Sequence, residues 1–368
     1  MLVALNLLYL IPGVVGGTET YARSLIRALA EEDDENEYVV YVSREAADLD
    51  VTPGPNFRRV VCPVVAMRRA ERYTWEQAAL PIQLMRDKPD LVHSLGYVSP
   101  LAARCPQVVT VHDVNFLGHK GRRTPLGRAV VRFFVERTVK RAERVITDSE
   151  FSRGEIRRLL GVPDSKLRVI HLAGRDLSNV SGGDRVPEAV RNLNRPYVLA
   201  FSSLSAHKNI PRLITAFARI SHLVPHSLVL IGHLPEKSAA RDAMQAAGDR
   251  VVFTGYIPDD EVDALMRTAS LFAFPSLYEG FGLPVLDAQH AGVPVACSSA
   301  GALPEVAGAG AVIFNPLSVD DMAESLKKSL LDLELRERLI DAGFANARQF
   351  SWSSTARETI EVYRSVAS

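Results

Sequence analysis

The sequence predicts an α/β protein with two doubly wound parallel-sheet domains, and three observations support this prediction. The chain has 368 residues, which suggests two domains at roughly 150 residues each. Short, continuously apolar runs alternate with amphipathic stretches of helical period, as expected for parallel strands that helices cover on both faces. The alternation pauses once, over residues 172–195, where apolar residues are fewer and a Ser-Gly-Gly occurs.

Short apolar runs in the first half of the chain are predicted to be strands, at 2–8, 38–43, 91–94, 108–113, 144–149 and 167–171. Helical segments lie between several of them. In TETYARSLIRALAEE, apolar Tyr21, Leu25 and Leu29 recur at every fourth position, which places them on one helix face. GRAVVRFFVERTVKRAE and SEFSRGEIRRLLG also have helical patterns. We therefore expect a first domain over residues 1–175 and a linker over 176–195.

The same alternation restarts after the linker. Strands are expected at 197–203, 227–232, 250–255, 271–276, 294–299 and 311–316. The helix DDEVDALMRTA begins with acidic residues, which suit the positive N-terminal end of a helix dipole. A second domain is therefore expected over 196–350, with a closing helix over 351–368.

Composition narrows the classes of function. Lys and Arg number 43 and Asp and Glu number 43, and this zero net charge argues against a nucleic-acid-binding protein. The three cysteines lack metal-ligand spacing and are expected to be buried thiols in a reducing compartment. No run reaches the roughly 18 apolar residues of a membrane helix, so we expect a cytoplasmic protein. Asp48 and Asp50 form a DxD pattern, but we expect no metal site.

Three positions in the first half offer useful chemistry directly after strands, where ligands of such sheets bind. Gly16 and Gly17 precede a helix whose free N–H groups could hold a phosphate, or they could form a plain turn. His112 ends a strand and could exchange a proton near neutral pH, or it could be a hydrogen-bonded core residue. Ser149 lies between a strand and a helix, where it could contact a ligand or cap the helix.

The second half places charged residues in two loops that follow strands. In SSLSAHKN, His207 and Lys208 precede a helix, and the lysine could neutralise a phosphate or be solvated. In SLYEGFGLPVLDAQHAG, Glu279 follows a strand, and Asp287 lies eight positions later in a helix that Pro284 could open. Both carboxylates could accept hydrogen bonds from sugar or ribose hydroxyls. Asp287 could instead stabilise the helix dipole.

Backbone groups at the start of that helix form the other half of this predicted site. The N–H groups of Phe281, Gly282 and Leu283 would be free to hold an anion. With the lysine and the first glycine loop, they describe a site for a diphosphate. Backbone near Gly255 and Tyr256 could read a nucleotide base.

A strongly basic stretch is found at residues 118–144, with nine Lys or Arg and two Glu. Arg128 and Arg132 share a predicted helix face, and Phe133 and Phe134 offer apolar surface. The segment could meet an anionic acceptor or the cytoplasmic membrane leaflet, or it could be a solvated outer helix face.

Taken together, these motifs resemble glycosyltransferase family 4 (GT4), especially its bacterial mannosyl- and rhamnosyltransferases. The resemblance covers nearly the whole chain. EGFGLP with an acid eight positions after the glutamate is highly specific, and HKN and VHD add support. FSWSSTARETIEVY resembles the closing helix of the family, which crosses back onto the first domain. The resemblance implies the GT-B fold, in which two Rossmann-like domains face each other.

The resemblance also implies roles for individual residues. His112 would lie near the anomeric carbon, Lys208 would neutralise the diphosphate, and Glu279 would bind sugar hydroxyls. The implied donor-binding residues are Gly16, Gly17, Ser149, Ser202, His207, Gly255, Tyr256, Gly280, Phe281, Gly282, Leu283 and Asp287. Three of them depart from the family pattern. Asp287 replaces a usual Glu, His207 often an Arg, and Ser202 a common Gly.

The leading hypothesis is a retaining hexosyltransferase that uses a nucleotide-diphosphate sugar such as GDP-mannose or a UDP-sugar. The acceptor would be a hydroxyl of a glycan or lipid-linked molecule in cell-surface polysaccharide synthesis. No cofactor and no metal are expected, since positive side chains and helix ends would replace the metal. The alternatives are a sugar-nucleotide epimerase or phosphorylase of the same fold, or a non-catalytic nucleotide-sugar-binding protein.

Overall fold

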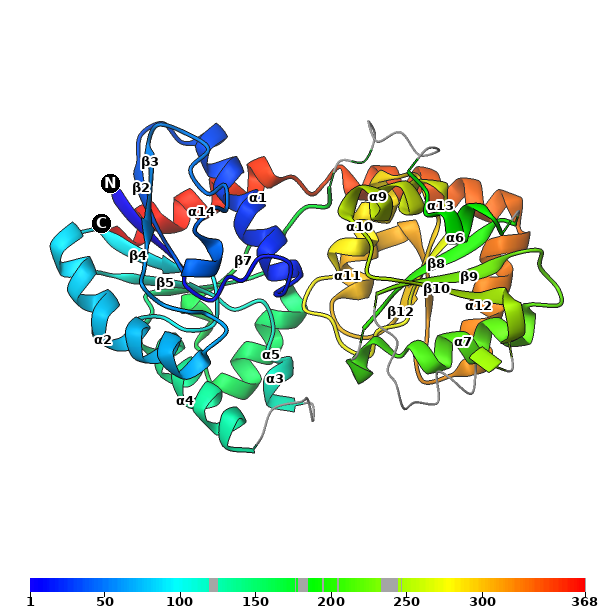
Figure 1. The fold of residues 1–368 in the computed structure, drawn as a ribbon, viewed down its shortest axis with the longest axis horizontal. Coiled ribbons are helices and arrows are strands. Elements are labelled where there is room, and N and C mark those ends of the chain that lie inside the picture. The colour runs from blue at the N-terminus through cyan, green and yellow to red at the C-terminus, as the bar shows by residue number, and fades with distance from the viewer. Residues whose placement is uncertain are drawn as a thin grey trace. The chain divides into compact units, whose positions relative to one another are not determined.

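A computed structural model describes residues 1–118, 125–175, 177, 185–193, 195–203, 205–232, 244–245 and 247–367. The chain divides into two compact units. The first contains Met1–Leu172 and Ser351–Ser368, and the second contains Ala173–Phe350. Each unit is a parallel sheet with helices on both faces (Figure 1).

The first unit has a seven-stranded parallel sheet in the order β3-β2-β1-β4-β5-β6-β7. Its strands are β1 (Leu2–Leu7), β2 (Glu37–Val42), β3 (Phe57–Val61), β4 (Leu91–Ser94), β5 (Gln107–Thr110), β6 (Arg144–Thr147) and β7 (Leu167–Val169). The inner strands β4 and β5 are buried along their whole length, as expected for parallel strands covered on both faces, and polar residues such as His93 are buried with them.

The helices of this unit are α1 (Gly17–Glu32), α2 (Arg69–Asp87), α3 (Asn115–Gly118), α4 (Pro125–Arg141), α5 (Glu150–Leu160) and α14 (Trp352–Ala367), with short 3-10 turns η1 (Arg44–Ala46) and η2 (Asp164–Lys166). The expected apolar face of α1, with Tyr21, Leu25 and Leu29, is buried. The C-terminal helix α14 packs against α1 (Figure 1). The buried Tyr363 of α14 is bonded through its hydroxyl to Nδ1 of His93 at 2.7 Å.

The second unit repeats the design with six strands in the order β10-β9-β8-β11-β12-β13. They are β8 (Tyr197–Ser202), β9 (Ser227–Gly232), β10 (Val251–Gly255), β11 (Leu271–Phe274), β12 (Val295–Ser298) and β13 (Ala311–Phe314). Its helices are α6 (Glu188–Arg191), α7 (Ile210–Ile220), α9 (Asp259–Thr268), α10 (Leu283–His290), α11 (Leu303–Ala307), α12 (Val319–Leu331) and α13 (Leu333–Ala347), with 3-10 turns η3 (Ala206–Lys208), η4 (Gly248–Arg250) and η5 (Gly308–Gly310).

The boundary between the units differs from the predicted linker. The second unit begins at Ala173, not after a linker over 176–195. Leu177, Val186 and Val190 are buried in the core of that unit, so this polar-looking segment is anchored by isolated apolar side chains. Residues 176, 178–184 and 194 lie outside the described residues.

Candidate active site

Within each unit, the strand order of the sheet reverses at one point. In the first unit the reversal lies between β1 and β4, and in the second between β8 and β11. Ligands of doubly wound sheets bind at such points. The loop after β1 contains Gly16 and Gly17. The loops after β8 and β11 contain Lys208 and Glu279.

His112 follows β5 and is held by a carboxylate that sequence reasoning did not single out. Its Nδ1 lies 2.8 Å from Oδ2 of Asp148, and both side chains are nearly inaccessible. Burial alone would lower the pKa of His112, but the charge and hydrogen bond of Asp148 outweigh it, so the pKa is raised above 6.5. Among the described residues, Nε2 makes no hydrogen bond of ordinary geometry. Nε2 is itself buried, and a backbone contact with Leu95 also raises the pKa of this histidine.

Aromatic rings and a chain of polar groups fix the surroundings of this histidine. The ring of Tyr21 meets His112 edge-on, with ring centres 4.6 Å apart. The hydroxyl of Tyr21 is bonded to Oγ1 of Thr110 at 2.9 Å, and Nε2 of His93 reaches the same Oγ1 at 2.8 Å. Burial lowers the pKa of His93 to about 3, with a smaller effect from His112, so His93 is a neutral core residue. The pKa of His93 is thus lowered, whereas that of His112 is raised.

Gly16 and Gly17 lie at the start of α1. Gly16 caps α1 with a φ of 60°, a conformation that favours glycine, and Gly17 opens the helix. A Cβ on either residue would meet no heavy atom within 4 Å, so the helix start is open to a close ligand.

Ser149 is fully buried, and its side chain accepts the N–H of Ser152 at 3.0 Å as the N-cap of α5. The helix-capping alternative therefore describes its contact here.

The second unit brings together two of the three residues with an expected catalytic role. Nζ of Lys208 lies 2.6 Å from Oε1 of Glu279, although 71 positions separate them in sequence. The ammonium also lies over the ring of Phe274, 5.0 Å from its centre. Both side chains keep some accessible surface, 23% for the lysine and 16% for the glutamate. The ammonium has N–H groups left for a ligand, and the carboxylate has lone pairs left for hydroxyls.

Backbone contacts hold the two loops in register. The backbone N–H of Leu277 donates to the carbonyl of His207 at 2.7 Å, which ties the lysine loop to the glutamate loop. Asn209 adopts a φ of 57°, and its buried side chain donates to the carbonyls of Pro275 and Pro316. No role was predicted for Asn209. Its place in the HKN motif, directly after Lys208, could have indicated that it positions the lysine loop.

The helix after Glu279 begins at a buried turn of unusual geometry. Gly282 caps α10 with a φ of 113°, and a Cβ there would lie 2.6 Å from Cδ2 of Leu303. Leu283 is the first residue of the helix and Pro284 the second, so the early N–H groups point out of the helix end. Gly280 and Phe281 are buried, and the ring of Phe281 packs edge-on against Phe350.

Asp287 lies on α10 but is already engaged by an arginine. Its Oδ1 accepts the backbone N–H of Arg175 at 2.7 Å, and its Oδ2 accepts Nε and Nη2 of the same residue at 3.2 Å. Arg175 also pairs with Asp263 at 2.6 Å. Burial raises the pKa of Asp287, and Arg175 opposes this shift. The carboxylate therefore anchors the start of the second unit, and only its remaining lone pairs could reach a ribose.

The other expected donor contacts lie at strand ends. Ser202 ends β8 and is buried, and its carbonyl lies so close to Gly232 that a Cβ there would clash. His207 is half-buried in η3. Gly255 ends β10 with a φ of 72°, and Tyr256 is 75% exposed. An exposed tyrosine at the carboxyl edge of the sheet is available to a base.

The sequence also raised the questions of a metal site, a membrane-spanning helix and the role of the basic stretch 118–144. Among the described residues, no group of three or more His, Cys, Asp or Glu side chains is arranged to hold a metal ion. Nowhere in the described part of the chain is a helix both long and apolar enough to cross a bilayer. Within the basic stretch 118–144, residues 119–124 lie outside the description, and α4 covers Pro125–Arg141. Its Val131, Val135 and Val139 face the core.

The fold and these strand-end loops define a two-unit α/β protein with the architecture of GT-B glycosyltransferases. Family models match both units, as "Glycosyltransferase Family 4" over residues 15–173 and "Glycosyl transferases group 1" over 185–345. The chain belongs to the GT4 family of GT-B glycosyltransferases, as its motifs predicted.

Individual relatives agree with this assignment. The chain is 32% identical over 231 residues to the O-antigen chain mannosyltransferase B of Escherichia coli, which is 61% of this chain and 61% of that protein. It is 28% identical over 313 residues to the E. coli serotype-specific mannosyltransferase WbdA, and this covers 77% of the chain but only 38% of WbdA. The fold matches that of Anabaena Alr3699/HepE in complex with UDP-glucose with a TM-score of 0.74, at 20% identity, over 99% of this chain and 100% of that chain.

Proposed function

We propose that the protein is a retaining glycosyltransferase that moves a hexose from a nucleotide-diphosphate sugar to a hydroxyl of a glycan or lipid-linked acceptor. The observation that carries this proposal is the pairing of Lys208 with Glu279, which lies just before the start of α10. Relatives named as O-antigen and serotype-specific mannosyltransferases support a role in cell-surface polysaccharide synthesis and a donor such as GDP-mannose. The relative in complex with UDP-glucose keeps a UDP-sugar as the other candidate donor.

The proposed reaction depends on positive groups placed to stabilise the leaving diphosphate. Breaking the anomeric bond leaves negative charge on the diphosphate, and donors fixed in advance stabilise that charge most effectively. Lys208 supplies an ammonium, and the N–H groups of Phe281, Gly282 and Leu283 supply neutral donors at a helix start. Glu279 accepts sugar hydroxyls and orients the ring. The acceptor hydroxyl then attacks from the side that the diphosphate leaves, which retains the anomeric configuration.

In this proposal the loop at Gly16 and the imidazole of His112 are the contribution of the first unit. In this proposal Nε2 of His112 donates a hydrogen bond to the sugar near its anomeric carbon, since Asp148 keeps the imidazole oriented and favours its protonated form. Ser202, His207, Gly255, Tyr256 and Asp287 complete the proposed donor contacts. Positive side chains and helix ends take the part that a metal ion plays in other transferases.

Transfer assays on purified variants test the proposal. Lys208→Ala and Glu279→Ala should each cut the transfer rate at least about tenfold, the effect of about 1.4 kcal/mol of lost transition-state stabilisation. Lys327→Ala is the matched control, because that lysine also pairs with a glutamate at 2.6 Å but on the surface of α12. Wild-type rates in both site variants, or a product of inverted configuration, would contradict the proposal. Conversion of donor without an acceptor would favour an epimerase.

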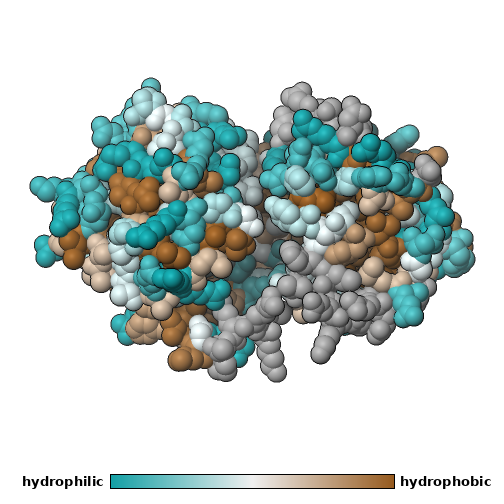
Figure 2. Space-filling model, viewed as in Figure 1, coloured by the Kyte–Doolittle hydropathy of each residue, from teal (hydrophilic) through white to brown (hydrophobic). Residues whose placement is uncertain are grey.

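We also propose that α4 contacts the membrane surface that carries a lipid-linked acceptor. Leu126, Val130 and Phe133 are exposed by 74%, 38% and 50%, and they repeat at helical spacing. Figure 2 shows apolar residues on the edge of the first unit where α4 lies. Arginines flank them, and the guanidinium of Arg137 lies over the ring of Phe133. An apolar stripe beside arginines is typical of a helix at an anionic bilayer surface.

Vesicle co-sedimentation tests this contact. Leu126→Ser with Phe133→Ser should reduce binding to vesicles that contain phosphatidylglycerol. Leu317→Ser should not, although Leu317 is 65% exposed on the second unit. Equal vesicle binding by the wild type, the double variant and Leu317→Ser would count against a membrane role for α4.

A further inference from the structure

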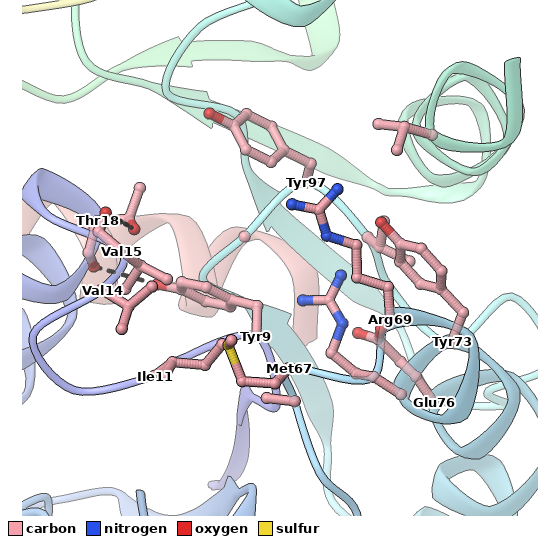
Figure 3. Close-up of a pocket in the computed structure, with 15 residues that line it drawn as sticks. Tyr9, Ile11, Val14, Val15, Thr18, Met67, Arg69, Tyr73, Glu76 and Tyr97 are labelled. Carbon is pink, nitrogen blue, oxygen red and sulfur yellow. Dashed lines mark hydrogen bonds between the residues drawn. The ribbon is translucent and has the colours of Figure 1, made fainter. Parts of the chain in front are cut away.

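A pocket of about 490 Å³ lies within the first unit, and Val15 and Thr18 in its lining flank Gly16 and Gly17. The loop after β1, the start of α2, the loop after β4 and α4 form its walls. Figure 3 shows Arg69, Tyr73 and Glu76 on α2 across the pocket from Val14, Val15 and Thr18. The pocket opens at the carboxyl end of the sheet, where its strand order reverses.

The charged side chains that line this pocket are mostly positive. Arg69 and Arg72 line it from the first turn of α2. Among the described residues neither forms an ion pair, and Nε of Arg72 is buried without a hydrogen-bond partner. The neighbouring Arg68, by contrast, is paired with Glu71. The start of a 19-residue helix adds further positive potential at the same place.

One carboxyl group faces the two arginines. Glu76 is buried, and its Oε1 accepts a hydrogen bond from Nδ2 of Asn6 at 2.7 Å. Burial raises the pKa of Glu76, while Arg72 and Asn6 oppose the shift. A single carboxylate at most offsets one of the two guanidinium charges. The pocket therefore keeps a net positive charge and a hydroxyl acceptor at its floor.

Aromatic rings that are locked by their neighbours form the rest of the lining. The ring of Tyr9 lies against Gly96, where a Cβ would come within 2.7 Å of it, and its hydroxyl donates to the carbonyl of Thr18. Tyr73 stacks on Phe134, with ring centres 5.2 Å apart, and supports the guanidinium of Arg72 at 4.6 Å. Such fixed, flat surfaces suit a sugar ring or another compact apolar face.

We propose that this pocket is the acceptor site and that the acceptor carries a phosphate group, bound jointly by Arg69 and Arg72 beside a hydroxyl bound by Glu76. A single carboxylate would be satisfied by one guanidinium fork, whereas a phosphate has enough oxygens to engage two. The inference rests on the proposed glycosyltransferase function. The phosphate could belong to a soluble sugar phosphate or to the phosphate of a lipid carrier, and the chemistry read by the arginines is the same.

Binding to the full-length protein tests the pocket directly. The probes are mannose 6-phosphate for the soluble source, farnesyl phosphate for the lipid source, and methyl α-mannoside as the phosphate-free control. Arg69→Ala and Arg72→Ala should each weaken the binding of at least one phosphate probe by about tenfold, as expected for a lost charge-assisted contact. Arg68→Ala should leave it within about twofold, since Arg68 does not line the pocket. Circular dichroism verifies that each variant is folded.

Two further arms separate the pocket from the donor site. Lys208→Ala should retain phosphate-probe binding, and Arg69→Ala and Arg72→Ala should retain the stabilisation given by nucleotide sugars. Probe binding that is lost in Lys208→Ala but unchanged in the arginine variants would overturn the acceptor proposal and leave the donor site intact. Binding of both phosphate probes no tighter than that of methyl α-mannoside would also overturn it. Phosphate binding that depends on the arginines, with no nucleotide sugar bound, would instead refute the proposed function.

Discussion

Each expected catalytic side chain obtains its chemistry from a partner distant in sequence. His112 is oriented by Asp148, 36 positions away, and Lys208 is paired with Glu279, 71 positions away. Asp287 lies only eight positions after Glu279, but its carboxylate is taken by Arg175. The two acids of one motif thus differ in availability. Glu279 keeps 16% of its side-chain surface accessible beside a lysine, and Asp287 is buried beneath an arginine.

The raised pKa of His112 gives a prediction about Asp148. Replacing Asp148 with Asn removes the charge that opposes burial, so the pKa of His112 should fall below about 6.5. NMR titration of the imidazole measures it directly. Asp113→Asn is the control and should lower the pKa less, since Asp113 contributes less to the shift. An unchanged pKa in Asp148→Asn would contradict the assignment.

The same shift has a consequence for stability. Because the folded pKa is raised, the contribution of protonated His112 is fully present below the unfolded value of about 6.5. It is lost as pH rises through the folded pKa. Wild type should therefore lose more unfolding free energy than Asp148→Asn between about pH 6 and pH 9. Parallel curves for the two proteins in urea unfolding would count against this coupling.

The contact between Arg175 and Asp287 predicts a stability effect that a ribose contact alone would not. Arg175→Ala leaves Asp287 buried without its ion-pair partner. The cost should be about 2–3 kcal/mol, below the value for a fully buried pair because Arg175 is partly exposed. Arg185→Ala, which breaks an exposed pair with Asp260, should cost less than about 0.5 kcal/mol. Similar small losses in both variants would show that Asp287 is not a structural anchor.

At the scale of elements, the start of α10 links the fold to the donor site. Gly282 holds a φ that other residues rarely adopt, and it faces Leu303 on α11. The turn places Glu279 before the helix and the backbone N–H groups of Gly282 and Leu283 at its start. A proline at the second helical position needs no N–H and so leaves this start undisturbed.

Gly282→Ala tests that turn. The strained backbone and the close approach to Leu303 should together cost about 1–3 kcal/mol of stability and weaken donor binding at least about tenfold. Gly154→Ala in α5 is the control, because a Cβ there meets no atom within 4 Å and its φ is ordinary. That control should be neutral or stabilising by up to about 1 kcal/mol. A Gly282→Ala protein as stable as the control would exclude this role for the turn.

Sequence patterns predicted most of the strands and several helices, but they did not single out β3, α2, α12 or α13. β3 has the sequence FRRVV with two exposed arginines, so it does not resemble a buried strand, yet it pairs with β2 at the sheet edge. The helix α2 contains Pro81 in its interior, which normally indicates a helix end. The pocket proposed for the acceptor was missed for the same reason, because its two arginines lie on α2. Contacts such as Asp148 with His112 depend on strand order, which the sequence does not state.

At the scale of the whole molecule, the C-terminal helix completes the first unit. After leaving that unit at Leu172, the chain builds the second and returns at Ser351. Thr355 donates its hydroxyl to the carbonyl of His171 at 2.7 Å, beside the point where the chain first leaves. The family resemblance predicted this return, but the boundary at Ala173 depended on a few buried side chains in a polar segment.

In the proposed function, the second unit binds a nucleotide-diphosphate sugar through Lys208 and Glu279. Thermal unfolding of the full chain with UDP-, GDP-, dTDP- and ADP-sugars tests it most directly. A ligand at 100 times its dissociation constant should add about 2.7 kcal/mol to stability, and this gain should be largely lost in Lys208→Ala and Glu279→Ala but kept in Lys327→Ala. Stabilisation by none of these ligands, or equal stabilisation in all the variants, would contradict the claim.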